Sequence, residues 1–265
     1  MLASETRQRA REALQGKWGK AVLATLIYAL IIGIMNWLFD FIPYIGPIAV
    51  FLLTIPFGFG FTATLMKLKR GEDITYFEFI TNGFNAFGKA WTTTLWTLVK
   101  MLLPIVAMIV SMIIMSVGLG LSFSGALLED PSVTAATVST SGSLLGIIGF
   151  LLYVVSWVWA ITKSYLYKLS FFVLFDNPNM TGKEVVEETA RLMNGNRWKL
   201  FCLELSFIGW AILAAFTFGI GFLWLMPYIL FAQVVFYENL AGKLNVQKEE
   251  NNLEEPKNDE IITEN

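Results

Sequence analysis

Long apolar stretches alternate with short polar stretches along most of the chain. Six of them reach the roughly 20 residues that an α-helix needs to cross the ~30 Å hydrocarbon core of a bilayer. The expected transmembrane windows are residues 20–39, 48–66, 98–120, 144–162, 200–218 and 221–238. The first window is too long, and ends in residues too bulky, for a cleaved signal peptide. The pattern therefore predicts an all-α membrane protein with six transmembrane helices.

The connections between the windows predict three antiparallel helical hairpins. Proline and glycine make a tight turn at residues 42–47, between the first two windows, and residues 218–221 form a short link between the last two. Links this short force consecutive helices to run antiparallel. The connection at residues 121–143 is longer and rich in serine, threonine and glycine, so it is expected to be a mobile loop.

A shorter amphipathic segment precedes each hairpin. Each segment starts at a hydroxyl residue (Ser4, Thr75 or Thr181) and ends at a glycine that a basic residue and a tryptophan soon follow. Glu78 and Glu184 lie three residues after the two threonines, which is the spacing of a helix capping box. We therefore expect three units, each a cytoplasmic-side amphipathic helix followed by a hairpin: residues 4–74, 75–180 and 181–244.

The segment that starts at Thr181 has the clearest amphipathic pattern. Val185 begins a stripe of apolar residues at helical spacing, and charged residues line the opposite side. Among them, Glu187 and Arg191 lie one helical turn apart, at a spacing that favours an ion pair. Gly195 suits the left-handed turn that ends such a helix.

Basic residues indicate how the helices are oriented. All 19 lysines and arginines lie before the first window, in the connections after the second and fourth windows, after the sixth window, or at the mouth of a window. The other connections contain none. Because positive charge is retained in the cytoplasm during insertion, both termini are expected on the cytoplasmic side of the plasma membrane. Residues 245–265 are polar and acidic and are expected to form a disordered cytoplasmic tail.

Composition narrows the possible functions mainly by exclusion. The chain is 55% apolar and 15% charged, and its mean hydropathy is +0.60, well above that of soluble domains. It has no histidine and one cysteine, Cys202, which excludes a Ser-His-Asp or Cys-His catalytic unit and a His/Cys zinc site. The net charge of −2 gives no support for nucleic-acid binding. We expect no enzymatic activity, no metal and no cofactor; the expected partners are the lipid bilayer and either other membrane proteins or anionic lipids.

Glu204 is the strongest candidate for a polar site within the membrane. It follows Trp198 by six residues, which places it about 7–9 Å deeper than that tryptophan by helical rise. A charge at this depth is costly, and glutamate is too short to reach the headgroups easily. Two interpretations stay open: a proton- or cation-sensitive site, or a structural brace with Lys163, Lys100 or a tyrosine. Lys100 can also extend its own stem to the headgroups.

Aromatic and basic residues at the inner ends of the fourth and fifth windows form a second candidate group. Tryptophan and tyrosine favour the membrane–water interface, where lysine and arginine meet the lipid headgroups. The simplest expectation is that these residues anchor the helices, and the alternative is a pocket for anionic headgroups. The group consists of Tyr165, Tyr167, Lys168, Arg197 and Trp198.

Several strings in the second half of the chain carry a family resemblance. They begin at Lys163, Asp176 and Arg191, and the most specific of them reads Leu-Ser-Phe-Ile-Gly-Trp at residues 205–210. Through these strings the chain resembles the domain-of-unknown-function-975 family, an uncharacterised family of bacterial integral-membrane proteins. The Gly-Lys-Trp string at residues 16–18 matches that family more loosely. The resemblance implies a six-span membrane protein and no established activity.

These observations favour a non-catalytic multi-pass membrane protein that acts as a scaffold or regulator in the cell envelope. The alternative is a transporter of small solutes or lipids, or a lipid-handling protein, with a cavity between the units. Pro56, Pro104 and Pro227 lie inside predicted windows, where a kink can serve packing or expose a midplane site. A polar cavity that contains Glu204 would favour transport, whereas a packed bundle with Glu204 capped by a lysine or tyrosine would favour a scaffold.

Overall fold

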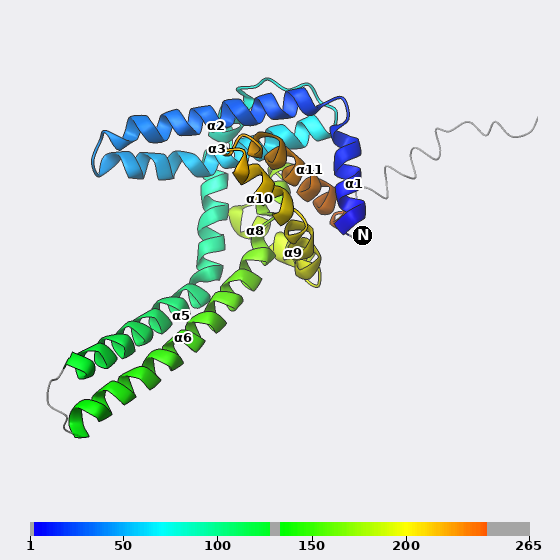
Figure 1. Ribbon diagram of the computed structural model, residues 1–265. Helices are drawn as coiled ribbons and strands as arrows, with labels where there is room; N and C mark the ends of the chain where they lie inside the picture. Colours follow the sequence, from blue (N-terminus) through cyan, green and yellow to red (C-terminus); the bar gives the residue numbers. More distant parts are fainter. Residues whose placement is uncertain (1–2, 128–132, 243–265) are drawn as a thin grey trace, which may run out of the picture.

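A computed structural model describes residues 3–127 and 133–242, and within these ranges the chain forms helices and turns with no strand (Figure 1). The helices are α1 (Ala3–Leu14), α2 (Trp18–Asp40), α3 (Ile45–Lys69), α4 (Glu78–Asn85), α5 (Phe87–Leu127), α6 (Val133–Tyr167), α7 (Ser170–Asp176), α8 (Gly182–Met193), α9 (Arg197–Leu205), α10 (Ile208–Phe216) and α11 (Phe222–Leu240).

Six helical segments are long and apolar enough to cross a membrane, as the sequence predicts. Each overlaps one expected window, but the third and fourth are much longer than expected: α5 has 41 residues and α6 has 35. The prediction of a loop over residues 121–143 is therefore wrong for most of its length. Residues 128–132, between these two helices, and the expected acidic tail at residues 245–265 lie outside the described residues.

Close packing explains why α5 and α6 continue through sequence that resembles a loop. The two helices lie side by side along most of their length (Figure 1). A Cβ atom added to Gly118 would lie only 2.2 Å from the backbone nitrogen of Gly146, so the backbones almost touch there. Further along, the hydroxyl oxygens of Ser122 and Ser143 lie 3.1 Å apart. Small residues, which predict a loop when read alone, permit this close contact between membrane helices.

Figure 1 shows two long helix pairs that extend from a common body. One pair is α2 with α3, and the other is α5 with α6. α5 changes direction part-way along its length, and Pro104 lies inside it. The body contains α1, α7, α8 and the C-terminal helices α9 to α11. Its hydrophobic core draws on all three sequence units and includes the buried side chains of Leu14, Met66, Leu174, Met193 and Phe231.

The fifth apolar segment is not one continuous helix. α9 ends at Leu205 and α10 starts at Ile208, where a single window was expected at residues 200–218. The Ser206 hydroxyl donates to the carbonyl oxygen of residue 203 (2.5 Å), and the Phe207 amide donates to the carbonyl of residue 204 instead (2.9 Å). Because the serine competes for the acceptor that the helix would use, the regular hydrogen-bond ladder stops here.

The short helices follow their sequence signals to different extents. α8 begins at the predicted capping box, in which Thr181 and Glu184 each bond the other's backbone amide. Gly195 has a φ of +77°, as expected for the turn after this helix. At α4 the box is incomplete: Glu78 accepts from the Thr75 amide (3.3 Å), but no side chain caps the helix, which begins only at Glu78.

The predicted pair between Glu187 and Arg191 is wrong. Arg191 instead bonds both carboxylate oxygens of Glu188, through Nε (2.7 Å) and Nη2 (2.6 Å). The Glu187 carboxylate lies 4.0 Å from the ammonium of Lys183, which precedes it by four residues. A two-point contact of this kind orients a guanidinium better than one hydrogen bond does, which favours the partner three residues away over the one at four.

Candidate functional site

Three donors hold the Glu204 carboxylate. The Tyr165 hydroxyl (2.8 Å) and the Lys168 ammonium (2.6 Å) donate to Oε2, and the Gln233 amide (2.9 Å) donates to Oε1. The Glu204 side chain is 18% exposed. Tyr165 belongs to α6, Lys168 directly follows it, and Gln233 belongs to α11. These contacts therefore tie α9 to the end of α6 and to α11. Glu204 is therefore a joint between helices.

Lys163 and Lys100 do not take part in this joint. Within residues 3–127 and 133–242, neither lysine forms an ion pair, and Lys100 lies on the exposed side of α5. Tyr165 and Lys168 are three residues apart and share one face of the chain at the end of α6. Lys163 is five residues before Lys168, so helical rotation directs it elsewhere. The structure thus places Glu204 with a tyrosine and a lysine, but the lysine is Lys168.

The expected interface residues do not form one headgroup site. Tyr165 and Lys168 belong to the cluster just described, where the Lys168 ammonium also lies 5.0 Å from the centre of the Tyr165 ring. Trp198 is 72% exposed, as an interface anchor would be. Tyr167 is buried in the hydrophobic core instead. The Arg197 Nε atom is buried and has no hydrogen-bond acceptor among the described residues.

A second cluster of charges lies where sequence reasoning placed no site, at the end of α3. We call it the Arg70 cluster; its members are Lys69, Arg70, Asp176, Tyr237 and Glu238. The Arg70 guanidinium lies 2.7 Å from Asp176 and 3.3 Å from Glu238. Lys69 also forms an ion pair with Glu238, and the Tyr237 hydroxyl donates to the second oxygen of Asp176 (2.8 Å). Burial alone would lower the pKa of Arg70, but the two carboxylates raise it.

The two carboxylates of the Arg70 cluster are almost fully buried, with side chains 5% exposed. From the sequence alone, Asp176 was used only as the start of a string that carries the family resemblance, and Glu238 was given no role. A signal was present, because a carboxylate in an apolar stretch needs a cationic partner. The sequence could not say which of many cations that partner is. Across both clusters the contacts join the three sequence units, with Arg70 in the first, Asp176 in the second and Glu238 in the third.

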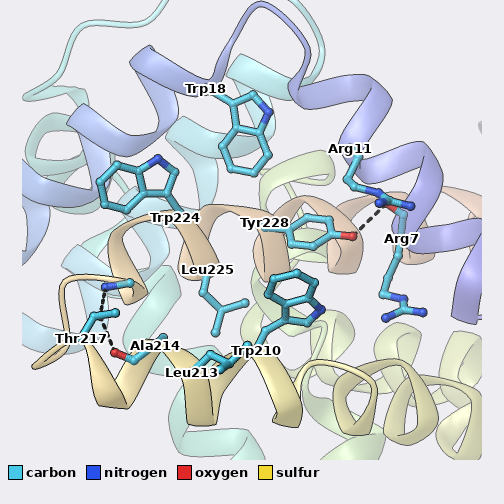
Figure 2. A pocket seen from close by; sticks show the side chains of 11 residues that line it. Arg7, Arg11, Trp18, Trp210, Leu213, Ala214, Thr217, Trp224, Leu225 and Tyr228 are labelled. Atoms are coloured by element: carbon cyan, nitrogen blue, oxygen red, sulfur yellow. Dashed lines mark hydrogen bonds between the residues drawn. The ribbon is translucent and has the colours of Figure 1, made fainter.

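A pocket of about 490 Å³ lies between α1, the start of α2, α10 and α11 (Figure 2). Figure 2 shows Arg7 and Arg11 at one end of it and Trp224 near the other. The rest of the lining is mainly aromatic and aliphatic, with Tyr228 in the middle and Leu225 below it. Glu204 is not part of this lining. The pocket therefore offers a cationic end and an apolar body, separate from both charge clusters.

Comparison with known proteins assigns the chain to a family. A family model described as a protein of unknown function, DUF975, matches residues 1–243. The chain belongs to the DUF975 family. This confirms the resemblance that the string at residues 205–210 suggests. The search of curated proteins and the search of solved structures gave no match.

Every feature described above lies within the part of the chain that matches DUF975. In this DUF975 protein the ion pairs of Glu204 and of the Arg70 cluster join helices inside the protein. The part of the chain that the structure describes contains no group of three histidine, cysteine or carboxylate side chains that could hold a metal. The joints can hold helices together, and the pocket can hold a small amphiphile. The arrangement can therefore support the packing of the helices and bind a ligand in the pocket.

Proposed function

We propose that this DUF975 protein is a non-catalytic multi-pass protein of the bacterial plasma membrane, with both termini in the cytoplasm. In this proposal it acts as a scaffold or regulator for other components of the cell envelope. The observation that carries the proposal is the bonding of two carboxylates, those of Glu204 and Glu238. Both are bonded inside the protein, between helices of different sequence units.

The bonding of Glu204 favours a scaffold over a proton-coupled transporter. A transport carboxylate must release its partners and meet water during each cycle. Glu204 instead accepts from a hydroxyl, an ammonium and an amide at once, at 2.6–2.9 Å. Removing one member of such a group leaves a partly buried charge without compensation, so the group resists opening. A fixed joint of this kind suits a scaffold, which acts by presenting a constant structure to its partners.

The proposed orientation of the protein in the membrane rests on the basic residues. Lys17, Lys69 and Arg70 lie together, because the Lys17 ammonium donates to the carbonyl oxygen of Lys69 (3.1 Å). Burial, and then the charge of Lys69, lowers the pKa of Lys17. A concentration of positive charge at one end of the helices supports a cytoplasmic position for that end.

Vesicle measurements test the scaffold against the transporter. The full-length protein, reconstituted in vesicles with a pH-sensitive dye inside, is expected to carry no proton flux above that of protein-free vesicles. Glu204→Gln is expected to leave this baseline unchanged while lowering the thermal midpoint. Proton flux in the wild-type protein that Glu204→Gln abolishes would overturn the proposal. Exposed Glu187, changed to glutamine, serves as the matched control for both readouts.

A second candidate function, lipid handling, is favoured by the pocket of Figure 2. The pocket lies between helices of the first and third units, but it is not the polar cavity expected for a transporter, because Glu204 and Lys163 are not in its lining. Its mainly apolar lining supports a lipid rather than a polar solute. In the same vesicles, movement of a fluorescent phospholipid between leaflets measures this activity. Acceleration that requires the protein would favour lipid handling, and an unchanged rate would favour the scaffold.

A further inference from the structure

The pocket between α1, the start of α2, α10 and α11 combines an apolar slot with a cationic end that has no ion-pair partner among the described residues. We propose that it binds one phospholipid with a negatively charged phosphate headgroup. The phosphate lies on Arg7 and Arg11, and one acyl chain fills the slot between α10 and α11 (Figure 2). The proposal requires only that α10 and α11 lie in the membrane with α1 at its surface. It does not depend on whether the protein is a scaffold or a lipid-handling protein.

The fold sets the two arginines before any ligand arrives. Arg7 and Arg11 are four residues apart on α1, so both lie on the side of the helix that faces the pocket. Two contacts hold this helix in place: Arg7 Nη1 donates to the Ser206 carbonyl oxygen (3.3 Å), and the Tyr228 hydroxyl donates to the Arg7 carbonyl oxygen (3.3 Å). A site that is formed in advance binds its ligand with a smaller loss of conformational freedom.

Among the residues that the structure describes, no carboxylate balances the charges of these arginines. Within residues 3–127 and 133–242, neither Arg7 nor Arg11 forms an ion pair, and the described lining of the pocket contains no carboxylate. The Nε atom of Arg7 is buried and has no acceptor there. Arg70, which lies between two carboxylates, shows the opposite arrangement. Arginine matches the geometry of a phosphate group with two parallel hydrogen bonds.

The apolar part of the pocket fits a hydrocarbon chain better than it fits water. Trp210, Leu213 and Trp224 are 57%, 59% and 50% exposed, and the buried side chains of Ala214 and Leu225 also line the slot. The volume of about 490 Å³ lies within the roughly 300–1,000 Å³ that is typical of small-ligand pockets. A free phosphate ion would occupy the cationic end and leave these side chains uncovered. A phospholipid covers both parts, which is why we choose it over a soluble phosphate compound.

The test uses the full-length protein, purified in detergent and stripped of bound lipid. Phosphatidylglycerol, phosphatidylcholine and inorganic phosphate are titrated separately, and bound lipid is counted by native mass spectrometry. We expect phosphatidylglycerol to bind saturably with one tight site. Phosphatidylcholine is expected to bind about tenfold more weakly, because its headgroup has no net charge to place on the arginines. Inorganic phosphate is expected not to displace phosphatidylglycerol.

Matched variants assign the binding to this pocket. Arg11→Gln is expected to weaken phosphatidylglycerol binding about tenfold, while Arg9→Gln, on the same helix but outside the lining, changes it less than about twofold. Arg11 is exposed and makes no ion pair in the described part of the chain, so its loss does not threaten folding. For the slot, Leu213→Ser is expected to weaken binding, and its exposed neighbour Ile212→Ser is expected not to.

Three results would each overturn the proposal. Equal loss in Arg9→Gln and Arg11→Gln would mean that α1 attracts any negative surface. Equal affinity for phosphatidylglycerol and phosphatidylcholine would show that the arginines do not select an anionic headgroup. Displacement by inorganic phosphate, with Leu213→Ser unchanged, would make the pocket a site for free phosphate. Proton flux or lipid movement in the vesicle experiments would leave all of these measurements unaffected, so failure of the proposed function is distinguishable from failure of the lipid site.

Discussion

The Arg70 guanidinium lies 2.7 Å from the Asp176 carboxylate, although Arg70 directly follows α3 and Asp176 ends α7, in different parts of the chain. Asp176 is 5% exposed and Arg70 is 25% exposed. A buried ion pair adds little stability over a pair of apolar residues, but removal of one partner is severe because it leaves the other charge uncompensated. The pair therefore makes correct assembly of these helices a condition for stability.

Asp176→Ala is expected to destabilise the protein strongly. Because Arg70 is partly exposed, we expect a loss toward the lower end of the roughly 3–5 kcal/mol that follows when a buried pair is broken. Thermal unfolding of the purified protein measures it. Asp73→Ala removes the partner of Lys20 from a pair that is largely exposed to solvent, and it should leave the midpoint unchanged. Similar midpoints for the two variants would contradict the importance of burial.

Tyr165→Phe tests the joint at Glu204 without removing any charge. The substitution keeps the ring, which meets Phe201 edge-on at 5.7 Å between centroids, and removes only the hydroxyl that donates to Glu204. Since hydrogen bonds to charged groups contribute about 1.5–3 kcal/mol, we expect a loss near the lower value at this partly exposed site. Tyr44, which is 88% exposed, gives the control variant Tyr44→Phe. Equal effects of the two would show that the hydroxyl at Glu204 contributes nothing.

Gly118→Ala is expected to separate α5 from α6. The new methyl group would meet the backbone of Gly146 at 2.2 Å, and overpacking of this kind costs about 1–3 kcal/mol. Gly120→Ala, two positions further along the same helix, places its methyl group with nothing within 4 Å and should raise stability by up to about 1 kcal/mol through helix propensity. Opposite shifts of the thermal midpoint are thus expected. Two shifts of the same sign would contradict the close contact at Gly118.

The orientation of the helices is testable with cysteine labels. In a Cys202→Ala background, Ser124→Cys is expected to react with a membrane-impermeant maleimide on intact cells. Lys199→Cys is expected to react only after the cells are opened. Both positions are exposed. According to the charge pattern, Ser124 lies on the outer side of the membrane and Lys199 lies on the cytoplasmic side. Labelling of Ser124→Cys only after lysis would reverse the proposed topology.

Acid is expected to loosen α8 at its start. The Thr181 amide, donating to Glu184, lowers the pKa of that carboxyl below its usual value of about 4.3. A carboxyl whose pKa is lowered by folding stabilises the helix above its unfolded pKa, and this contribution is lost as the pH falls through the folded value. Hydrogen exchange of the first α8 amides, corrected for intrinsic rates, should therefore lose protection as the pH falls below the unfolded pKa and through the lowered folded value. Glu184→Gln should start less protected and show no such step.

Local signals in the sequence predicted local structure. The six apolar windows and the capping box at Thr181 depend on residues close together in the chain, and the structure contains both. The extent of α5 and α6 could not be predicted in the same way. Serine and glycine between residues 121 and 143 favour a loop unless another helix lies against them, and only the fold supplies that helix.

The partners of the charged residues also depended on the fold. Lys163 and Lys168 were both available to Glu204, and their rotation about the end of α6 decided between them. The break between α9 and α10 arises because Ser206 takes the carbonyl of residue 203, a competition that many serines in helices do not win. The Arg70 cluster required three segments to meet, which no spacing in the sequence could indicate.

The contacts of α1 also have a consequence for the order in which the protein is made. This helix is translated long before the surface it packs on, which is formed by residues such as Ser206 and Tyr228. Until then Ala10 and Leu14, which are fully buried in the folded protein, lie on a helix that lacks its packing partners α9 and α11. Docking of α1 therefore has to wait for synthesis of α9 and α11, and a nascent product that stops before α9 retains α1 as an unattached, positively charged helix.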